Sequence, residues 1–406
     1  MDENKFAFII CVNNELYFEE CKYWIKRLIR PNDYRVDIIT IRDATSICAA
    51  YNWGMKNSDA KYKIYMHQDV FIRNKFFLKD LLRLFENPET GMVGMMGGTR
   101  MPKTGVAYLA WDVASVDCRD ADVAYFLCGN PKIKQDMQVE AVDGLLIATQ
   151  YDIHWREDLF NGFDFYDISA SFEVRRAGYH IIVPYMQTPW VIHDSSFAKL
   201  SGYDKNRKIC IDEYKEFLYD ENGFEFEYQK EWEDLSSQLA EQLKQMLNNG
   251  KWELAQSIIL EYRKGKKKNS TLEMIGIMTD IWKIEKQMAV PHMFFEEGLT
   301  WKEIYEKYIK VRFALRRIEI GLPESEYENI MKDFIHKRIS VDALIVFVLH
   351  STVDKKQVFK IFENIATKAC MEKEFCRLQI LQNTKGIGKI PIVYTKLVKR
   401  LERNLK

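Results

Sequence analysis

The 406-residue chain lacks a long apolar run. Its longest strongly apolar stretch outside the expected strands spans residues 341–349, well short of the ~20 residues that cross a bilayer, and Asp342 interrupts it. The start of the chain, Met1 to Asn4, also lacks the basic residues of a secretory signal. We therefore expect a soluble, cytoplasmic protein.

The chain lacks a net charge as well, with 59 basic and 59 acidic side chains. A neutral total argues against nucleic acid as a partner, because proteins that coat it are strongly basic. The balance nevertheless conceals an asymmetry: residues 1–225 hold 27 basic against 34 acidic residues, and residues 226–406 hold 32 against 25. The two parts carry opposite net charges of −7 and +7, which predicts two domains with different tasks.

Paired cysteines and the common catalytic motifs are missing too. None of the eight cysteines forms a Cys-x-x-Cys pair, which favours buried free thiols over disulfides or a zinc site. The sequence has no Walker phosphate loop, no G-x-G-x-x-G, no G-x-S-x-G and no H-E-x-x-H. Their absence removes the commonest nucleotide hydrolases, dehydrogenases, serine hydrolases and zinc proteases from consideration.

Residues 1–225 alternate short apolar runs with amphipathic stretches. The expected strands are 6–12, 36–41, 62–66, 92–96, 145–149 and 181–184, and the expected helices include 16–29 and 46–56. This order predicts an α/β domain built on a parallel sheet. Residues 97–137 are rich in Gly, Asp and aromatics without clear periodicity, so we expect a functional loop region there.

Residues 226–406 instead carry long helical periodicities separated by short polar breaks. The expected helices are 235–247, 252–263, 272–288, 301–320, 324–336, 341–350, 355–369 and 390–404. This pattern predicts an all-α C-terminal domain. The turn from Asn248 to Lys251, with Ala255 on the second helix, resembles a tetratricopeptide hairpin, and an irregular bundle fits equally well.

Polar residues follow three of the expected strands, at the edge where a parallel α/β sheet binds its ligands. These are Asn13-Asn14-Glu15, Arg42-Asp43 and His67-Gln68-Asp69. His67 and Asp69 could share one divalent cation, and the alternative is a surface turn in which Asp69 caps a helix.

Two further polar positions lie later in the same part of the chain. Asp167 has aromatic and apolar neighbours, which can raise a carboxyl pKa toward neutrality and suit it to accept a proton; alternatively it is a helix N-cap. His193 follows an apolar strand, where a histidine is either packed or a ligand.

Several segments, in this order, resemble the GT-A glycosyltransferases of family 2. They are 46–54 (SICAAYNWG), 65–70 (YMHQDV), 142–144 (VDG), 165–167 (FYD) and 175–179 (RRAGY). The likeness is closest to a bacterial glycosyltransferase-like branch with H-Q-D-V where most members have D-x-D. It covers about residues 5–200 and implies a GT-A fold for residues 1–225.

The resemblance also implies a donor site. Asn13, Glu15 and Asp43 match positions that hold the nucleoside, Asn52 belongs to the 46–54 segment, and Asp143 with Gly144 matches the donor-sugar pocket. Asp69 matches the metal-binding Asp of D-x-D, and His193 matches a histidine near the metal in some members. Because His67 replaces the first Asp, the resemblance implies Mn²⁺ somewhat more than Mg²⁺.

Asp167 matches the general base of the family. The family often has two consecutive acidic residues here; Asp167 matches the second of them, and Tyr166 stands in place of the first. Ser169 stands where the family commonly has a further Asp. Tyr166 and Trp111 are the weaker candidates for acceptor contacts.

The resemblance therefore implies an inverting hexosyltransferase of bacterial polysaccharide or glycoconjugate synthesis. Its donor would be a nucleotide-diphosphate sugar, a UDP-sugar first among them, and its acceptor a hydroxyl of a glycan, lipid-linked or protein-linked molecule. A nucleotidyltransferase on a similar sheet and a non-catalytic sugar- or nucleotide-binding scaffold remain alternatives.

Two further partners are possible for residues 226–406, a membrane and a second copy of the chain. Basic residues from Lys264 to Lys268 and from Lys396 to Lys406 could hold the enzyme at the anionic inner face of a membrane, unless they are simply solvated helix faces. The helices could also form a homo-oligomer.

Overall fold

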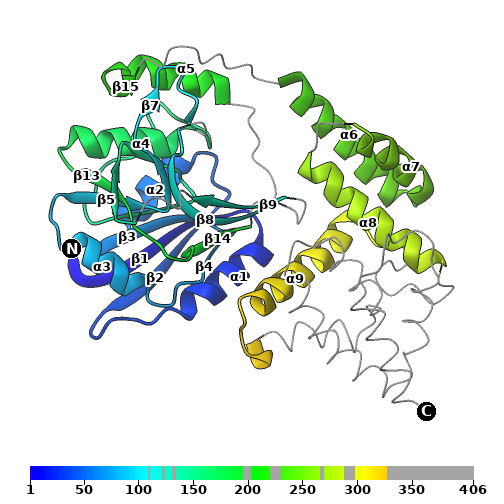
Figure 1. Ribbon diagram of the computed structural model, residues 1–406, viewed down its shortest axis with the longest axis horizontal. Coiled ribbons are helices and arrows are strands. Elements are labelled where there is room, and N and C mark those ends of the chain that lie inside the picture. The colour runs from blue at the N-terminus through cyan, green and yellow to red at the C-terminus, as the bar shows by residue number, and fades with distance from the viewer. Residues whose placement is uncertain are drawn as a thin grey trace. The chain divides into compact units, whose positions relative to one another are not determined.

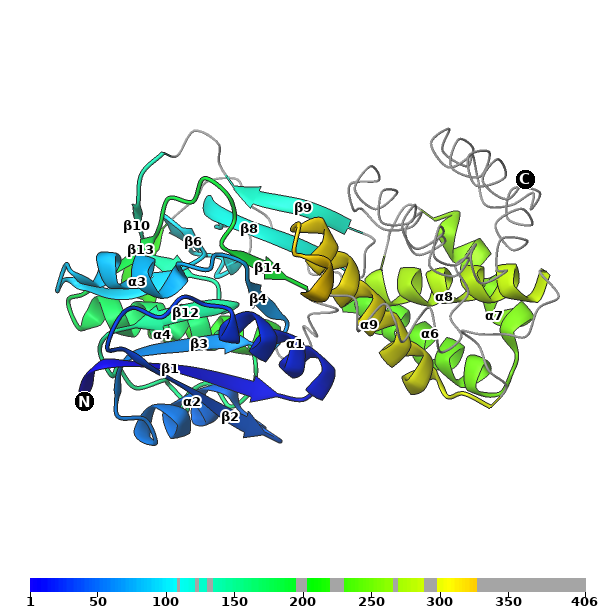
Figure 2. The same cartoon turned by 90° about the horizontal axis from the view of Figure 1, so that it is seen from below.

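The computed structural model describes residues 1–107, 110–120, 124–129, 134–194, 203–219, 230–265, 269–287 and 298–326. The chain divides into two compact units, the first made of Met1–Asp120 and Tyr125–Tyr228 and the second beginning its main span at Gln229. Figures 1 and 2 show that the first unit is mixed α/β and that the second is helical. The helices expected at 341–350, 355–369 and 390–404, most of 324–336, and the basic residues 266–268 and 396–406 lie outside the described residues.

The first unit is built on a seven-stranded sheet in the order β10-β13-β5-β12-β3-β1-β2. Its strands are β1 (Asp2–Val12), β2 (Arg35–Arg42), β3 (Ala60–His67), β5 (Thr90–Gly94), β10 (Met137–Val139), β12 (Leu146–Thr149) and β13 (His180–Val183). β1 is parallel to β2 and β3, as expected. The structure differs from the predicted parallel sheet at β12, which runs antiparallel to both β3 and β5.

Strand β1, between β3 and β2, contributes a fully buried segment to the core. Its residues Phe6 to Ile10 are fully buried, and burial of a large apolar side chain stabilises a fold by about 1.5–3 kcal/mol. Helix α2 (Ile47–Lys56) packs on β1 and β2, whereas α3 (Phe77–Phe85) and α4 (Tyr166–Arg176) pack on β5. Gly54 permits the close approach of α2, because a Cβ there would lie 2.5 Å from Cγ2 of Ile9.

A second sheet contains β4 (Val70–Ile72), β6 (Met96–Gly98), β8 (Val113–Asp120), β11 (Ala141–Val142) and β14 (Val191–His193), with β9 (Ala124–Gly129) paired to β8. β6, β8 and β9 fall largely within residues 97–137, so the expectation of an irregular loop region there is wrong. β8 was not predicted because its polar residues interrupt the apolar pattern by which a strand is identified in the sequence. Asp117 is buried in this strand, 3.7 Å from Arg73, which supplies the charge that its burial requires.

The remaining elements of the first unit join these sheets. They are α1 (Glu15–Lys26), α5 (Tyr203–Glu213), a 3₁₀ turn at Lys215–Phe217, and the two short paired strands β7 (Met101–Pro102) and β15 (Leu218–Tyr219). Helix α1 packs against β4 of the second sheet. Cys21, Cys48 and Cys210 are buried free thiols, as expected, Cys11 is half-buried and also free, and Cys118 is buried.

The described part of the second unit consists of α6 (Lys230–Asn248), α7 (Trp252–Arg263), α8 (Ser270–Gln287), α9 (Trp301–Glu319) and a 3₁₀ turn at Glu324–Glu326. The expectation of helices is confirmed here. Gly250 has φ +71° in the turn between α6 and α7, a conformation that favours glycine, and Ala255 on α7 is fully buried.

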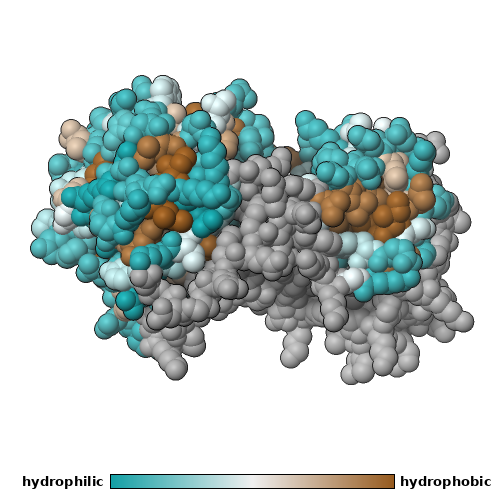
Figure 3. Space-filling model, turned by 90° about the horizontal axis from the view of Figure 1, so that it is seen from above, coloured by the Kyte–Doolittle hydropathy of each residue, from teal (hydrophilic) through white to brown (hydrophobic). Residues whose placement is uncertain are grey.

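An apolar stripe crosses the surface of the second unit in Figure 3. The exposed large apolar side chains of its described helices are Leu235, Leu254 and Leu260, on α6 and α7. Among the helices that the structure describes, none combines the length and the apolar content needed to cross a bilayer.

Candidate active site

The expected strand ends do meet at one edge of the first sheet. In the strand register Cys11 lies opposite His67 and Val12 lies opposite Arg42, so residues 13, 43 and 68 all follow at the same edge. The side chain of Gln68 joins two of these strand ends, because its Oε1 accepts hydrogen bonds from the backbone N–H groups of Asn13 and Asn14, both at 3.0 Å. This edge is where a ligand of such a sheet binds.

Two further segments reach the same edge. The backbone N–H of His67 donates to the carbonyl of Leu145 at 3.0 Å, which places Asp143 and Gly144 beside the end of β3. The N–H of Asp194 donates to the carbonyl of Asp69 at 2.8 Å, and His193 pairs with Val70 across β14 and β4. His193 therefore lies next to Asp69, although the two are far apart in sequence.

His67, Asp69 and His193 form a cluster, called here the His-Asp-His cluster, whose candidate ligand atoms all lie within 4.8 Å of one another. Oδ1 of Asp69 is 4.0 Å from Nδ1 of His67 and 3.7 Å from Nε2 of His193. It is buried and accepts no hydrogen bond from the described residues. A buried carboxylate oxygen held beyond hydrogen-bond reach of two imidazoles fits a bound divalent cation.

The surroundings of the cluster support this fit. Burial lowers the pKa of His67, which keeps its ring neutral and able to offer a lone pair. The alternative interpretation, in which Asp69 caps a helix, is wrong, because the strand β4 follows Asp69 directly.

Asp167 lies in the first turn of α4, near Gly144. Its Oδ2 accepts a hydrogen bond from the backbone N–H of Gly144 at 2.9 Å. Burial, and secondarily the charge of Asp143, raise the pKa of Asp167 to about 7, which suits a carboxylate to accept a proton near neutrality. The N-cap of α4 is Phe165, held at φ 64°, so the alternative of Asp167 as the N-cap is wrong.

Tyr166 precedes Asp167 and points to the His-Asp-His cluster. It is only 5% exposed, and its hydroxyl oxygen is 2.5 Å from Nε2 of His67. Gly144 makes room for it, since a Cβ on Gly144 would lie 2.0 Å from that hydroxyl. This position favours a supporting role for Tyr166 over the expected acceptor contact.

The other candidate residues have varied surroundings. Asn13 and Asp43 are exposed at the sheet edge, and Glu15 pairs with Arg42 at 2.7 Å. Asn52 is buried, and its amide bonds to the backbone N–H and carbonyl of Trp155 at 2.9 and 2.8 Å, so the structure gives it a role in holding that loop. Trp111 is half-buried in the segment between β7 and β8.

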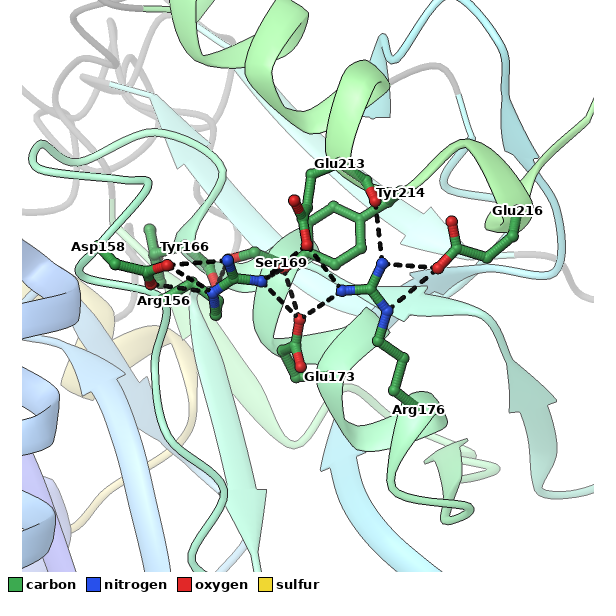
Figure 4. A network of polar contacts seen from close by, with 9 residues as sticks. All are labelled: Arg156, Asp158, Tyr166, Ser169, Glu173, Arg176, Glu213, Tyr214 and Glu216. Atoms are coloured by element: carbon green, nitrogen blue, oxygen red, sulfur yellow. Dashed lines mark hydrogen bonds and ion pairs between the residues drawn. The ribbon is translucent and has the colours of Figure 1, made fainter.

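A set of charged residues behind the site was not predicted. Figure 4 shows that Arg156, Glu173, Arg176, Glu213 and Glu216, called here the α4 network, tie α4 to its neighbours. Nη1 of Arg156 lies 3.0 Å from both Glu173 and Glu213, and Nη1 of Arg176 lies 3.0 and 2.9 Å from the same two carboxylates. The only signal in the sequence is the spacing of Glu173 and Arg176 on one helix.

Among the comparisons with known proteins, one identifies a family. The sequence pattern of the glycosyltransferase-like family matches residues 7–214. A search among curated proteins finds no match. Among solved structures, the mannosyltransferase PcManGT from Pyrobaculum calidifontis, in complex with GDP-Man and Mn²⁺, aligns with 87% of this chain and 88% of its own, at 9% identity and a TM-score of 0.33. S. aureus TarS 1-349 aligns with 69% of this chain and 91% of its own, at 11% identity and a TM-score of 0.32. Scores this low do not bear on the substrate or cofactor of this chain.

The first unit is thus an α/β protein with a convergent polar site at the carboxyl ends of its parallel strands. Because the matched residues make up just over half of the sequence, the chain belongs to the glycosyltransferase-like family. Glycosyl transfer is the activity that this membership supports.

Proposed function

We propose that the first unit is an inverting, metal-dependent glycosyltransferase that uses a nucleotide-diphosphate sugar. The observation that carries this proposal is Oδ1 of Asp69, which has no hydrogen-bond partner among the described residues and lies between two imidazole nitrogens at the same sheet edge as Asp167. A diphosphate and an acidic site repel each other, and a cation held between them offsets that repulsion.

His67, Asp69 and His193 would hold the cation. When bound, a divalent cation offsets negative charge on a diphosphate. Mn²⁺ suits this set better than Mg²⁺, because Mg²⁺ prefers oxygen ligands and two of the three ligands here are imidazoles.

Asp167 would act as the general base. Its carboxylate takes the proton of the acceptor hydroxyl while that oxygen attacks the anomeric carbon and the bond from this carbon to the diphosphate oxygen breaks. One displacement of this kind inverts the anomeric configuration. The hydrogen bond from Gly144 holds Oδ2 of Asp167, which keeps the base oriented while its raised pKa lets it receive the proton.

The remaining residues of the edge would bind the donor. Asn13, Glu15 and Asp43 lie at the ends of β1 and β2, where they can accept or donate hydrogen bonds to a base and ribose, with UDP the first candidate nucleotide. Asp143 is close enough to Asp167 to raise its pKa, so a sugar held by Asp143 would lie beside the base. We propose a glycan, lipid-linked or protein-linked hydroxyl as the acceptor.

The helical unit would determine where in the cell the enzyme acts. We propose that its basic segments place the enzyme at the inner face of a membrane, where lipid-linked acceptors lie. Co-sedimentation with liposomes tests this, and binding that does not depend on anionic lipid would contradict it.

The activity is tested with a panel of nucleotide sugars and purified full-length protein. We expect Mn²⁺-dependent release of the nucleotide diphosphate from one donor, faster in the presence of its acceptor, and complete loss in excess EDTA. Full turnover in EDTA would contradict the metal-dependent mechanism. Retention of the anomeric configuration in the product would contradict the single displacement.

A further inference from the structure

The hydroxyl of Tyr166 determines which nitrogen of His67 is free. The hydroxyl oxygen lies 2.5 Å from Nε2 of His67, a short hydrogen bond, while Nδ1 of the same ring faces Oδ1 of Asp69 at 4.0 Å. The two ring nitrogens therefore face different partners. Only Nδ1 is directed into the His-Asp-His cluster.

A neutral imidazole has one N–H and one lone pair, so a hydrogen bond at one nitrogen decides what the other can do. If Nε2 carries the proton and donates it to the Tyr166 oxygen, Nδ1 keeps a lone pair for a metal. If the tyrosine hydroxyl donated instead, Nδ1 would carry the proton and could not bind a cation. Metal-binding histidines usually donate their second N–H to a fixed acceptor.

We propose that Tyr166 is a positioning residue of the metal site, which accepts a hydrogen bond from Nε2–H of His67 and so presents Nδ1 to the cation. This inference rests on the proposed metal site. It assigns Tyr166 a task that differs from the acceptor contact expected from the sequence.

The protein holds Tyr166 in place from several sides. Its ring meets that of Tyr51 edge to face, with centroids 6.0 Å apart, and lies 6.2 Å from that of Trp155. The absence of a side chain on Gly144 leaves the space that the hydroxyl occupies. Because Tyr166 opens the same helical turn as Asp167, the orientation of the metal ligand and that of the base depend on one element.

The test compares Tyr166→Phe with Tyr51→Phe, which makes the same chemical change on the neighbouring buried ring. The Tyr51 hydroxyl has no hydrogen-bond partner among the described residues, so its removal leaves His67 untouched. The measurement is the Kd of Mn²⁺ for the full chain, from the electron paramagnetic resonance signal of free Mn²⁺. We expect Tyr166→Phe to weaken binding about 10–100-fold and Tyr51→Phe to leave it unchanged. Equal affinity in both variants would overturn the proposal.

A second measurement reads the wild-type protein and uses a variant only to assign its signals. With Zn²⁺ as a diamagnetic probe, the ring ¹⁵N shifts of His67, assigned by their loss in His67→Gln, report which nitrogen carries the proton. We expect a protonated Nε2 and a metal-shifted Nδ1. A metal-shifted Nε2 would overturn the assignment.

Gly144→Ala offers an independent perturbation, because its methyl group must displace the Tyr166 hydroxyl. We expect weaker Mn²⁺ binding in this variant as well, and unchanged affinity would count against the proposal. The proposed function can fail while the role of Tyr166 holds: this would be the result if the protein showed the expected Mn²⁺ affinities but turned over no nucleotide sugar. Conversely, metal-dependent transfer with no effect of Tyr166→Phe on Mn²⁺ binding would remove only the role of Tyr166.

Discussion

The first unit contains two charged clusters that differ in how completely their groups are paired. In the α4 network, Oε1 of Glu173 alone accepts from Arg156 and Arg176 at 3.0 Å and from the Tyr214 hydroxyl at 2.9 Å. In the His-Asp-His cluster, Oδ1 of Asp69 accepts nothing from the described residues. Both clusters are partly buried, so exposure to water does not explain the difference.

The hydrogen bonds distinguish a cluster that holds the fold together from one that can bind a ligand. A saturated network has no capacity left for a ligand and contributes by holding its elements together. A buried acceptor without a partner costs free energy in the folded chain, and such a cost is commonly offset by a ligand. The α4 network therefore positions α4, and the cluster at the other end of that helix is where a ligand is expected.

The largest expected effect comes from Asp167→Asn at the functional end of α4. An asparagine oxygen can still accept the hydrogen bond from Gly144, but the amide cannot take up a proton. We expect kcat to fall about 10²–10⁴-fold while nucleotide binding, measured by calorimetry, is retained.

The matched control is Asp164→Asn, the same change in the loop before α4. Asp164 is half-buried and interacts with Asn206 rather than with Gly144. Its substitution should leave kcat within about twofold, in line with the small effects of changes outside key interactions. Equal losses in the two variants would show that the loop, and not the base, limits transfer.

Asp69→Asn tests the unpaired cluster directly. The Kd of Mn²⁺ should rise by more than the roughly 10–100-fold typical of a supporting residue, because a ligand itself is changed. The metal-free protein should not lose stability, since no hydrogen bond to Oδ1 from the described residues is removed and an unpartnered buried carboxylate oxygen itself costs free energy. Chemical denaturation without metal measures the second quantity, and a large loss of stability would mean that Asp69 is structural.

The sequence was sufficient for the strands and helices whose apolar pattern is strong. β1 and α2 were predicted within a few residues, because fully buried or amphipathic segments leave a clear periodicity. β8 was not, since its buried Asp117 depends on Arg73 from another segment. The direction of β12 was also hidden, because an apolar run does not record which way it crosses a sheet.

The candidate site shows the same division. A shared cation site for His67 and Asp69 could be predicted because the two residues are close in sequence at a strand end. His193 reaches them through the pairing of β14 with β4, which the sequence does not show. The contact between Tyr166 and His67 depends on a glycine in a third segment, Gly144. No pattern in one sequence predicts that three-way fit, so the role of Tyr166 required the structure.

Glu173→Ala should break the saturated cluster. The change removes one of the carboxylates that bind Arg156 and Arg176, which keep Glu213, and it removes the acceptor that the Tyr214 hydroxyl has among the described residues. We expect a cost of about 1–3 kcal/mol in the free energy of unfolding. Glu216→Ala is the control, because its side chain is 52% exposed and, among the described residues, forms its ion pair with Arg176, so the change should cost less than about 1 kcal/mol. Mn²⁺ affinity below the unfolding temperature should be unchanged in both, and a large change would mean that the two clusters are not independent.

Glu213 of the α4 network and Asp167 in the first turn of α4 should change the stability with pH in opposite directions. Hydrogen bonds from Arg176 and Arg156 lower the pKa of Glu213, so its contribution to stability is present above its unfolded pKa and is lost as the pH falls. The pKa of Asp167 is raised from 3.8 to about 7, so the folded protein binds the extra proton and loses stability as the pH rises across that interval. Asp167→Asn should remove this decline, measured by thermal denaturation of the metal-free protein, and leave the loss at low pH in place.

In the transfer assay, the ionised carboxylate is the active form, so the rate should rise about tenfold per pH unit toward a midpoint near 7, or lower once a cation favours ionisation. A rate that is flat from pH 5 to 8 while chemistry limits turnover would show that the carboxylate at this end of α4 is not the base.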